Sequence, residues 1–217
     1  MKKIRSKVAV LLFLNMFGSV IAVCDDSVVQ KMERAQDAVS IPNRVKRDYK
    51  LSHANSMKID SEVIANVNFN APGGYTLEKL DNNNGAWIVK KALDPEVAIA
   101  ISVEKSKTVA VTRENYTFED LGDSPLDGQP YFIFRITPKR KQTELILGQV
   151  WIDKKTLLIR RVEGTMKPPS IWVKKIHVKL DFDSSEGVWV LSDMEAIAEI
   201  RFIGVRKLTA HLMSYKK

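Results

Sequence analysis

Four strand-like runs within residues 130–182 constrain the fold of this chain more than any other feature. Each run is dense in aromatic and β-branched residues, as β-strands are. Turn-forming residues such as Pro138, Asp153 and Gly164 separate the runs, so short connections should join them into an antiparallel meander. In the last run, 172–182, apolar residues alternate with charged ones, which predicts a sheet with one apolar face and one wet face. The apolar face needs a cover.

Strand-like segments also flank this meander. Upstream they span residues 44–51, 57–69, 75–80, 86–90 and 115–121, and downstream they span 188–192, 195–203 and 205–215. Together they predict a mainly β chain with about ten or eleven strands in a one-sided antiparallel sheet. Gly204 stands where a bulge or a tight bend would let the last strand turn back.

Two helices complete the predicted elements. Residues 27–39 should form the first helix, with Ser27 as its N-cap and an apolar stripe of Val28, Met32, Ala35 and Val39. We expect this helix to lie across the apolar face of the sheet as part of a lid. A second helix is favoured from Asp94, although the alternation over residues 97–103 leaves a strand open there.

The first 22 residues have the pattern of an export signal. A basic end precedes a short apolar core at residues 8–17, and small residues lead to Ala22, where cleavage is expected. The apolar core is too short to span a bilayer, and no later segment is long and uncharged enough. We therefore expect a signal peptide, 1–22, and a single domain, 23–217, that is soluble in the periplasm; a retained anchor helix is the alternative.

Cys24 is the only cysteine, so the chain cannot form an intrachain disulfide. Residues 21–24 resemble a lipoprotein processing box, but Val23 occupies a position that such boxes fill with Gly, Ala or Ser. We therefore favour a free periplasmic form over acylation of Cys24.

The charge balance excludes some partners. The predicted signal holds four of the 34 Lys and Arg residues and no acidic residue, which leaves 30 basic against 26 acidic residues, a net charge of +4. An exported chain of this mild charge is not expected to bind nucleic acid, and it retains a weak attraction to anionic membranes.

Catalytic and metal-binding patterns are missing from the sequence. His53, His177 and His211 are isolated from one another, and none stands at metal-ligand spacing from a cysteine or paired carboxylates. There is no nucleophile elbow, phosphate-binding glycine loop or dinucleotide fingerprint. We expect no enzymatic activity, no metal and no cofactor. The basic clusters at 139–141 and 174–175 are interpreted as charges that keep turns soluble, with contact to an acidic partner or to lipid headgroups as the alternative.

The second half of the chain resembles the LolA-like outer-membrane lipoprotein-sorting proteins. The resemblance rests on residues 112–118 (TRENYTF), 127–129 (DGQ), 138–140 (PKR), 148–153 (GQVWID), 161–164 (RVEG) and 169–174 (PSIWVK). It covers the chain from Thr112 to the C-terminus, the N-terminal helix agrees in kind, and residues 44–111 agree only in pattern.

The resemblance implies a curved antiparallel half-barrel covered by helices, whose hollow takes lipoprotein acyl chains. It favours a monomeric, non-enzymatic periplasmic carrier or chaperone for lipoprotein acyl chains or other lipids; the alternative is an envelope sensor or interaction module that binds a protein partner. Strand parity assigns ten residues to the apolar lining: Phe132, Phe134, Ile136, Trp172, Ile176, Val178, Leu180, Ala198, Ile200 and Phe202. If this lining is an open cavity and not a sealed core, truncating Phe134 should cost little stability.

Overall fold

The computed structural model describes residues 26–56, 58–69, 75–80, 103–126, 128–185 and 187–217. Two helices lie in these ranges, α1 (Asp26–Ala38) and α3 (Val103–Val109). The strands are β1 (Arg44–His53), β2 (Ile59–Asn68), β3 (Tyr75–Leu80), β4 (Tyr116–Leu126), β5 (Gln129–Pro138), β6 (Ile146–Asp153), β7 (Ile159–Met166), β8 (Val173–Ser185), β9 (Val188–Ile200) and β10 (Gly204–Lys216).

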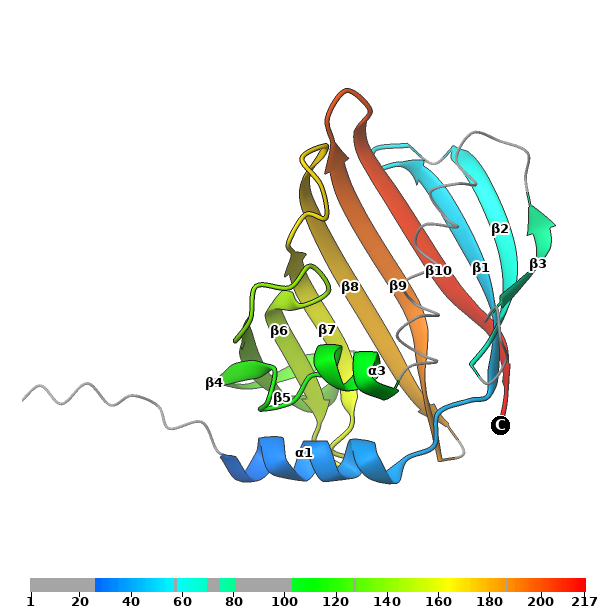
Figure 1. Cartoon of the computed structure of the whole chain (residues 1–217). Helices are drawn as coiled ribbons and strands as arrows, with labels where there is room; N and C mark the ends of the chain where they lie inside the picture. The colour runs from blue at the N-terminus through cyan, green and yellow to red at the C-terminus, as the bar shows by residue number, and fades with distance from the viewer. Residues whose placement is uncertain (1–25, 57, 70–74, 81–102, 127, 186) are drawn as a thin grey trace, which may run out of the picture.

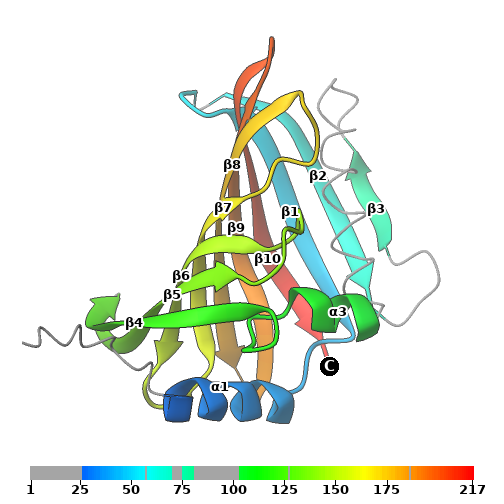
Figure 2. The ribbon, with the colours of Figure 1, turned by 60° about the vertical axis from the view of Figure 1, so that its left-hand side comes forward.

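One antiparallel sheet of ten strands contains all of these, in the order β3-β2-β1-β10-β9-β8-β7-β6-β5-β4. From β4 to β10 each strand pairs with the next one along the chain, as the meander predicted. Strand β1 pairs with β10, so the first and the last described strands are neighbours within the sheet. Figures 1 and 2 show the sheet curving into an open half-barrel, with α1 across its lower end. The predicted mainly β half-barrel is confirmed.

Most predicted strands are present with shifted ends. The segments predicted at 188–192 and 195–203 are one strand, β9, which ends at Ile200. The strand predicted at 86–90, the helix predicted from Asp94 and the signal peptide lie outside the described residues. Helix α1 is described from Asp26, which places Ser27 inside the first turn and not at the predicted N-cap.

The first of two hydrophobic cores lies under α1, and we call it the helix-side core. Val28, Val29 and Met32 of α1 are buried against the concave face of β5–β8, together with Tyr116 at the start of β4. The buried sheet residues are Phe134, Ile136, Leu145, Ile146, Val150, Ile152, Ile159, Val162 and Val178. Two residues of the predicted stripe, Val28 and Met32, therefore pack on the sheet together with Val29, which the prediction left out, whereas Ala35 is only half-buried and Val39 lies beyond the end of α1.

A pair of glycines sits within this part of the concave face. Gly148 of β6 and Gly164 of β7 are register partners. A Cβ atom on Gly148 would lie 2.6 Å from the Cα of Gly164, and one on Gly164 would lie 2.7 Å from the Cα of Gly148. No side chain fits at such distances, so the pair allows the two backbones to curve tightly where the half-barrel bends.

The second core lies across β1, β2 and β10, and we call it the arginine-side core. Its buried members are Val45, Tyr49, Leu51, Val63, Ala65, Val67, Val190, Leu208 and Ala210. Arg47 shares their face and is only 3% exposed, and its Nη2 donates to the carbonyl oxygen of Leu191 at 3.3 Å. Burial lowers the pKa of Arg47, and burial raises the pKa of the neighbouring Tyr49, a shift that the Arg47 charge opposes.

Helix α3 packs beside the connection between β5 and β6. Asn115, which is fully buried, donates from Nδ2 to the carbonyl oxygens of Lys107 at 2.7 Å and of Ala110 at 2.8 Å. Arg140 donates in turn to Asn115 Oδ1 and to the carbonyl oxygen of Thr108. The amide of Asn115 thus satisfies carbonyl groups at the end of α3 that the helix itself leaves unpaired.

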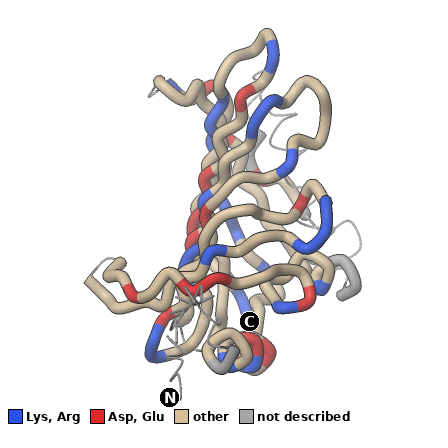
Figure 3. The backbone as a smooth tube through the Cα atoms, turned by 90° about the vertical axis from the view of Figure 1, so that its left-hand side faces the viewer, with Lys and Arg blue, Asp and Glu red and all other residues tan. Residues whose placement is uncertain are grey.

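The convex face carries charged side chains in cross-strand pairs. Arg161 Nε lies 2.5 Å from Asp181 Oδ1, His177 Nε2 lies 3.2 Å from Glu163 Oε1, and Lys207 Nζ lies 2.5 Å from Glu195 Oε2. Figure 3 shows the alternation of basic and acidic residues along these strands. The wet face predicted from the alternation in β8 is therefore the convex face, and His177 is a half-buried surface residue, as predicted.

Candidate functional site

A row of apolar residues crosses the concave face from one core to the other. The strand register places Gly164, Val178, Ala196 and Leu208 side by side on β7, β8, β9 and β10. Ala196 packs against both cores. From β7 to β10 the concave face is therefore one continuous apolar surface, and β8 and β9 lie at the middle of the sheet.

The structure brings most of the predicted lining residues together on this surface. Phe134, Ile136 and Val178 are buried in the helix-side core, and Phe132, Ile176 and Leu180 pack against it half-buried. Ala198 faces Ile176 across the β8–β9 pairing, and it is half-buried, as is Ile200. These eight residues share the concave face, while their role in binding a ligand stays a prediction.

Trp172 and Phe202 lie elsewhere, which corrects their predicted position. A register shift between Val173 and Lys175 breaks the alternation of β8, so Trp172 no longer shares the face of Ile176. Because β9 ends at Ile200, Phe202 falls in the β9–β10 turn, where its backbone has a φ of 67°. The two rings contact each other outside the half-barrel, with centroids 6.1 Å apart.

Burial differs along the concave face. Phe134 is completely buried and meets Phe118 edge-on, with centroids 6.2 Å apart. On β9, at the middle of the sheet, Met194, Ala196, Ala198 and Ile200 are only half-buried. Central strands normally carry the most deeply buried side chains of a sheet, so the middle of this face has apolar surface that is not fully packed.

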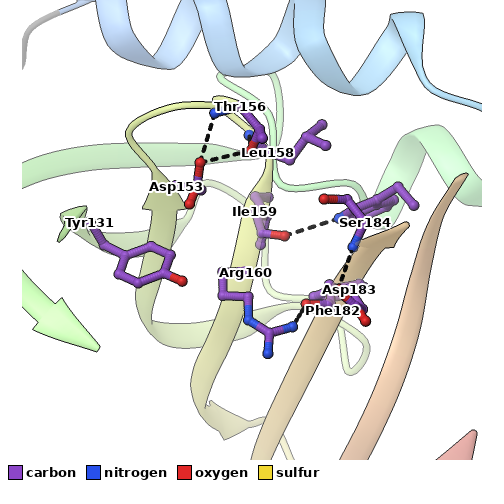
Figure 4. Close-up of a pocket in the computed structure, with 10 residues that line it drawn as sticks. Tyr131, Asp153, Thr156, Leu158, Ile159, Arg160, Phe182, Asp183 and Ser184 are labelled. Carbon is purple, nitrogen blue, oxygen red and sulfur yellow. Dashed lines mark hydrogen bonds between the residues drawn. The ribbon is translucent and has the colours of Figure 1, made fainter. Parts of the chain in front are cut away.

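A pocket of about 270 Å³ opens near the lower end of the half-barrel, beside α1 (Figure 4). Its lining includes the rings of Phe182 and Trp189, stacked with centroids 4.5 Å apart. Trp189 Nε1 donates to the Ile159 carbonyl at 3.0 Å, and Arg160 donates to the Phe182 carbonyl. These two polar groups are thus already bonded to the chain, but Asp153, Thr156, Asp183 and Ser184 also line the pocket, so its wall is mixed polar and aromatic.

Among the described residues, no group of three or more His, Cys, Asp or Glu could hold a metal ion. His53 and His211 each lie beside one carboxylate, Asp60 at 3.9 Å and Asp193 at 2.7 Å. Within the same ranges, no helix is long and apolar enough to cross a membrane.

Known structures share the outline of this fold at low sequence identity. A DUF1329 family protein from Desulfovibrio piger is 12% identical, with a TM-score of 0.46 over 88% of this chain and 90% of that one. A LolA superfamily protein from Nitrosomonas europaea is 9% identical, with a TM-score of 0.40 over 87% of this chain and 92% of that one. No protein-family model and no curated protein matches the sequence.

Proposed function

We propose that this protein holds the acyl chains of a lipid or lipoprotein against the concave face of its sheet. The role is that of a carrier or chaperone in the periplasm, and it involves no catalysis. The observation that carries the proposal is the half-buried apolar surface of β9 at the middle of a ten-stranded sheet.

The lining of this surface has the right chemistry for an acyl chain. Side chains that face the hollow on β8 and β9 are aliphatic, among them Ile176, Leu180, Met194 and Ile200. An acyl chain gains about 0.8 kcal/mol for each CH₂ group that leaves water, and it asks for no hydrogen bonds in return. A continuous aliphatic surface therefore binds such a chain without polar contacts.

The residues at the centre of the row are also small. Gly164 and Ala196 flank Val178, and Ala198 follows Ala196 on the same face of β9. Short side chains leave the floor of the hollow low, which gives a chain room to lie across the strands. An ordinary sealed core would instead fill this position with large residues at close-packed density.

A pair of adjacent variants tests the proposal. Ala198→Phe puts a large ring on the concave face, while Ile197→Phe enlarges the neighbouring side chain, which pairs with His177 on the convex face. We expect Ala198→Phe to weaken binding of a fluorescent fatty acid about tenfold or more, because the ring occupies the ligand's volume. Ile197→Phe should bind as the unchanged protein does.

Both variants are also unfolded with denaturant, so that a lost fold is not mistaken for a blocked site. Equal binding by the two variants would place the ligand away from the hollow. If the unchanged protein binds no fatty acid and no lipoprotein, the carrier proposal is wrong. A protein partner in the envelope would then be the use of this fold that is left to test.

A further inference from the structure

The end of the half-barrel opposite α1 carries exposed apolar side chains on its turns, and we call it the rim. Ile171 and Trp172 lie in the β7–β8 connection and are 77% and 56% exposed, while Phe202 and Ile203 lie in the β9–β10 turn. The backbone N–H of Arg201 donates to the Trp172 carbonyl at 2.8 Å, which holds the two turns together. Figure 1 shows both turns at the upper end of the molecule.

Phe202, at the apex of the β9–β10 turn, is unusual both in its exposure and in its backbone conformation. It is 94% exposed, so its ring is in water. Its φ of 67° belongs to the left-handed region, which bulky residues rarely adopt and which Asn and Gly adopt readily. Its contact with the Trp172 ring leaves Phe202 almost wholly exposed, and the backbone geometry disfavours a bulky residue, whereas contact with an apolar phase outside the protein would account for a phenylalanine at this position.

The rim is also basic. Residues 53–60, 167–175 and 199–207 contain seven Lys and Arg against two acidic residues, Asp60 and Glu199. Both acids are already paired, Asp60 with Arg206 and Glu199 with Lys174. Four exposed cations of the rim have no ion pair within the described residues: Lys58, Lys167, Lys175 and Arg201. Figure 3 shows the basic residues in these upper turns.

We propose that the rim docks the protein on the surface of an anionic lipid bilayer. The rings of Trp172 and Phe202 would enter the headgroup boundary, as aromatic side chains do, while the cations meet lipid phosphates. Amphipathic elements enter this boundary by about 5–10 Å, a depth that suits the tips of turns. A stable protein interface instead needs about 800 Å² on each partner, which narrow turns do not supply.

Docking in this way points the open end of the half-barrel at the bilayer. The hollow then meets the membrane at the strand ends furthest from α1, where an acyl chain would enter or leave. The docking surface consists of the rim's own residues and does not depend on whether the concave face holds a lipid.

Flotation with lipid vesicles tests the docking. The purified protein should bind vesicles of phosphatidylcholine and phosphatidylglycerol, bind vesicles of pure phosphatidylcholine more weakly, and lose affinity as salt is raised. Phe202→Asn removes the ring and suits the left-handed backbone, so it should fold normally and bind about tenfold more weakly. Lys175→Gln with Arg201→Gln should weaken binding about twentyfold.

The controls change equivalent residues away from the rim. Ile41→Asn removes an exposed isoleucine that follows α1, and Lys31→Gln with Lys155→Gln removes two exposed cations. Neither should alter binding to anionic vesicles. Brominated lipids should quench tryptophan fluorescence in the unchanged protein, and Trp172→Phe should abolish most of that quenching.

Two results would overturn the proposal. One is a failure of vesicle binding to depend on the rim: the unchanged protein does not float with anionic vesicles, or the rim variants and the control variants bind them equally. The other is that the protein binds only native envelope vesicles, and that this binding is lost both on protease treatment of the vesicles and in Phe202→Asn. The second result would assign the rim to a protein partner.

Discussion

The two cores of this sheet are built on different principles. In the helix-side core the buried sheet residues are apolar apart from the hydroxyl of Tyr116, and three residues of α1 complete it. In the arginine-side core the concave face of β1 reads Val45, Arg47, Tyr49 and Leu51, so a cation stands among apolar neighbours. Ser61 on β2 is buried there as well.

This difference sets how each core responds to change. A purely apolar core loses stability in proportion to the volume removed from it, because its side chains are close-packed. A core with a buried charge depends in addition on the ionisation and hydrogen bonding of that group. Volume changes should therefore separate the helix-side core from the half-buried strand β9, and removal of the Arg47 charge should separate the two cores from each other.

The largest expected effect is that of Phe134→Ala in the helix-side core. Phe134 is fully buried and packs on Phe118, so its loss should lower the free energy of unfolding by about 3–5 kcal/mol. Chemical denaturation measures this directly. This expected loss replaces the expectation from the sequence, which was that Phe134 lines an open cavity and that its truncation costs little stability. A loss of less than about 1 kcal/mol would show that the site collapses without cost, as a mobile cover would allow.

The second effect is a fall in stability at alkaline pH. Burial raises the pKa of both Tyr49 and Tyr116 above the ordinary value of 10.0. The folded protein therefore keeps these protons where the unfolded chain loses them, so their contribution is complete below pH 10 and is lost as pH rises above it. Tyr49→Phe and Tyr116→Phe should each flatten the alkaline limb of the stability–pH curve.

Arg47 distinguishes the two tyrosines. Its charge opposes the rise in the pKa of Tyr49, whereas Tyr116, whose oxygen accepts from the backbone N–H of Ile146 at 3.2 Å, has no such cation among the causes of its shift. Arg47→Met should therefore raise the pKa of Tyr49 further and leave that of Tyr116 unchanged. Two background variants are needed, one that keeps only Tyr49 and one that keeps only Tyr116 of the five tyrosines. Titration of tyrosinate absorbance then measures each pKa with and without Arg47→Met, and equal shifts in both backgrounds would contradict the prediction.

The smallest expected effect is that of Ile200→Ala. Ile200 is half-buried at the end of β9, so its truncation should lower the free energy of unfolding by less than about 1 kcal/mol. Fatty-acid binding should fall at the same time, because the lost methyl groups belong to the proposed lining. Measured beside Phe134→Ala on the same samples, a core-sized loss here would mean that β9 is packed as tightly as the helix-side core.

Much of the fold could be predicted because the local alternation and the turn residues of the chain agree with the sheet that it forms. Strand β3 has the predicted ends, Tyr75 and Leu80, and alternation alone assigned the wet face of β8. The helix α3 was not predicted, because its seven residues, VEKSKTV, contain too few positions for a helical repeat.

The candidate site was predicted less completely, for two physical reasons. Parity assumes an unbroken strand, and the register shift between Val173 and Lys175 moved Trp172 off the face that parity gave it. Parity could also have placed Arg47 between Val45 and Tyr49 on one face, a signal that a search for apolar residues alone passes over. The burial of Phe134 by α1 depended on tertiary packing, which no local pattern contains.

The pairing of β1 with β10 bears on when this chain can fold. Seven consecutive strands, β4 to β10, are joined by local pairings, and such hairpins form within microseconds. Among the described strands, β1 to β3 attach to them through β10, which follows all the others along the chain. The early strands pair with one another, β1 with β2 and β2 with β3, but β1 must wait for β10 before its second edge is paired. The ten-stranded sheet therefore cannot be completed before β10 has been synthesised.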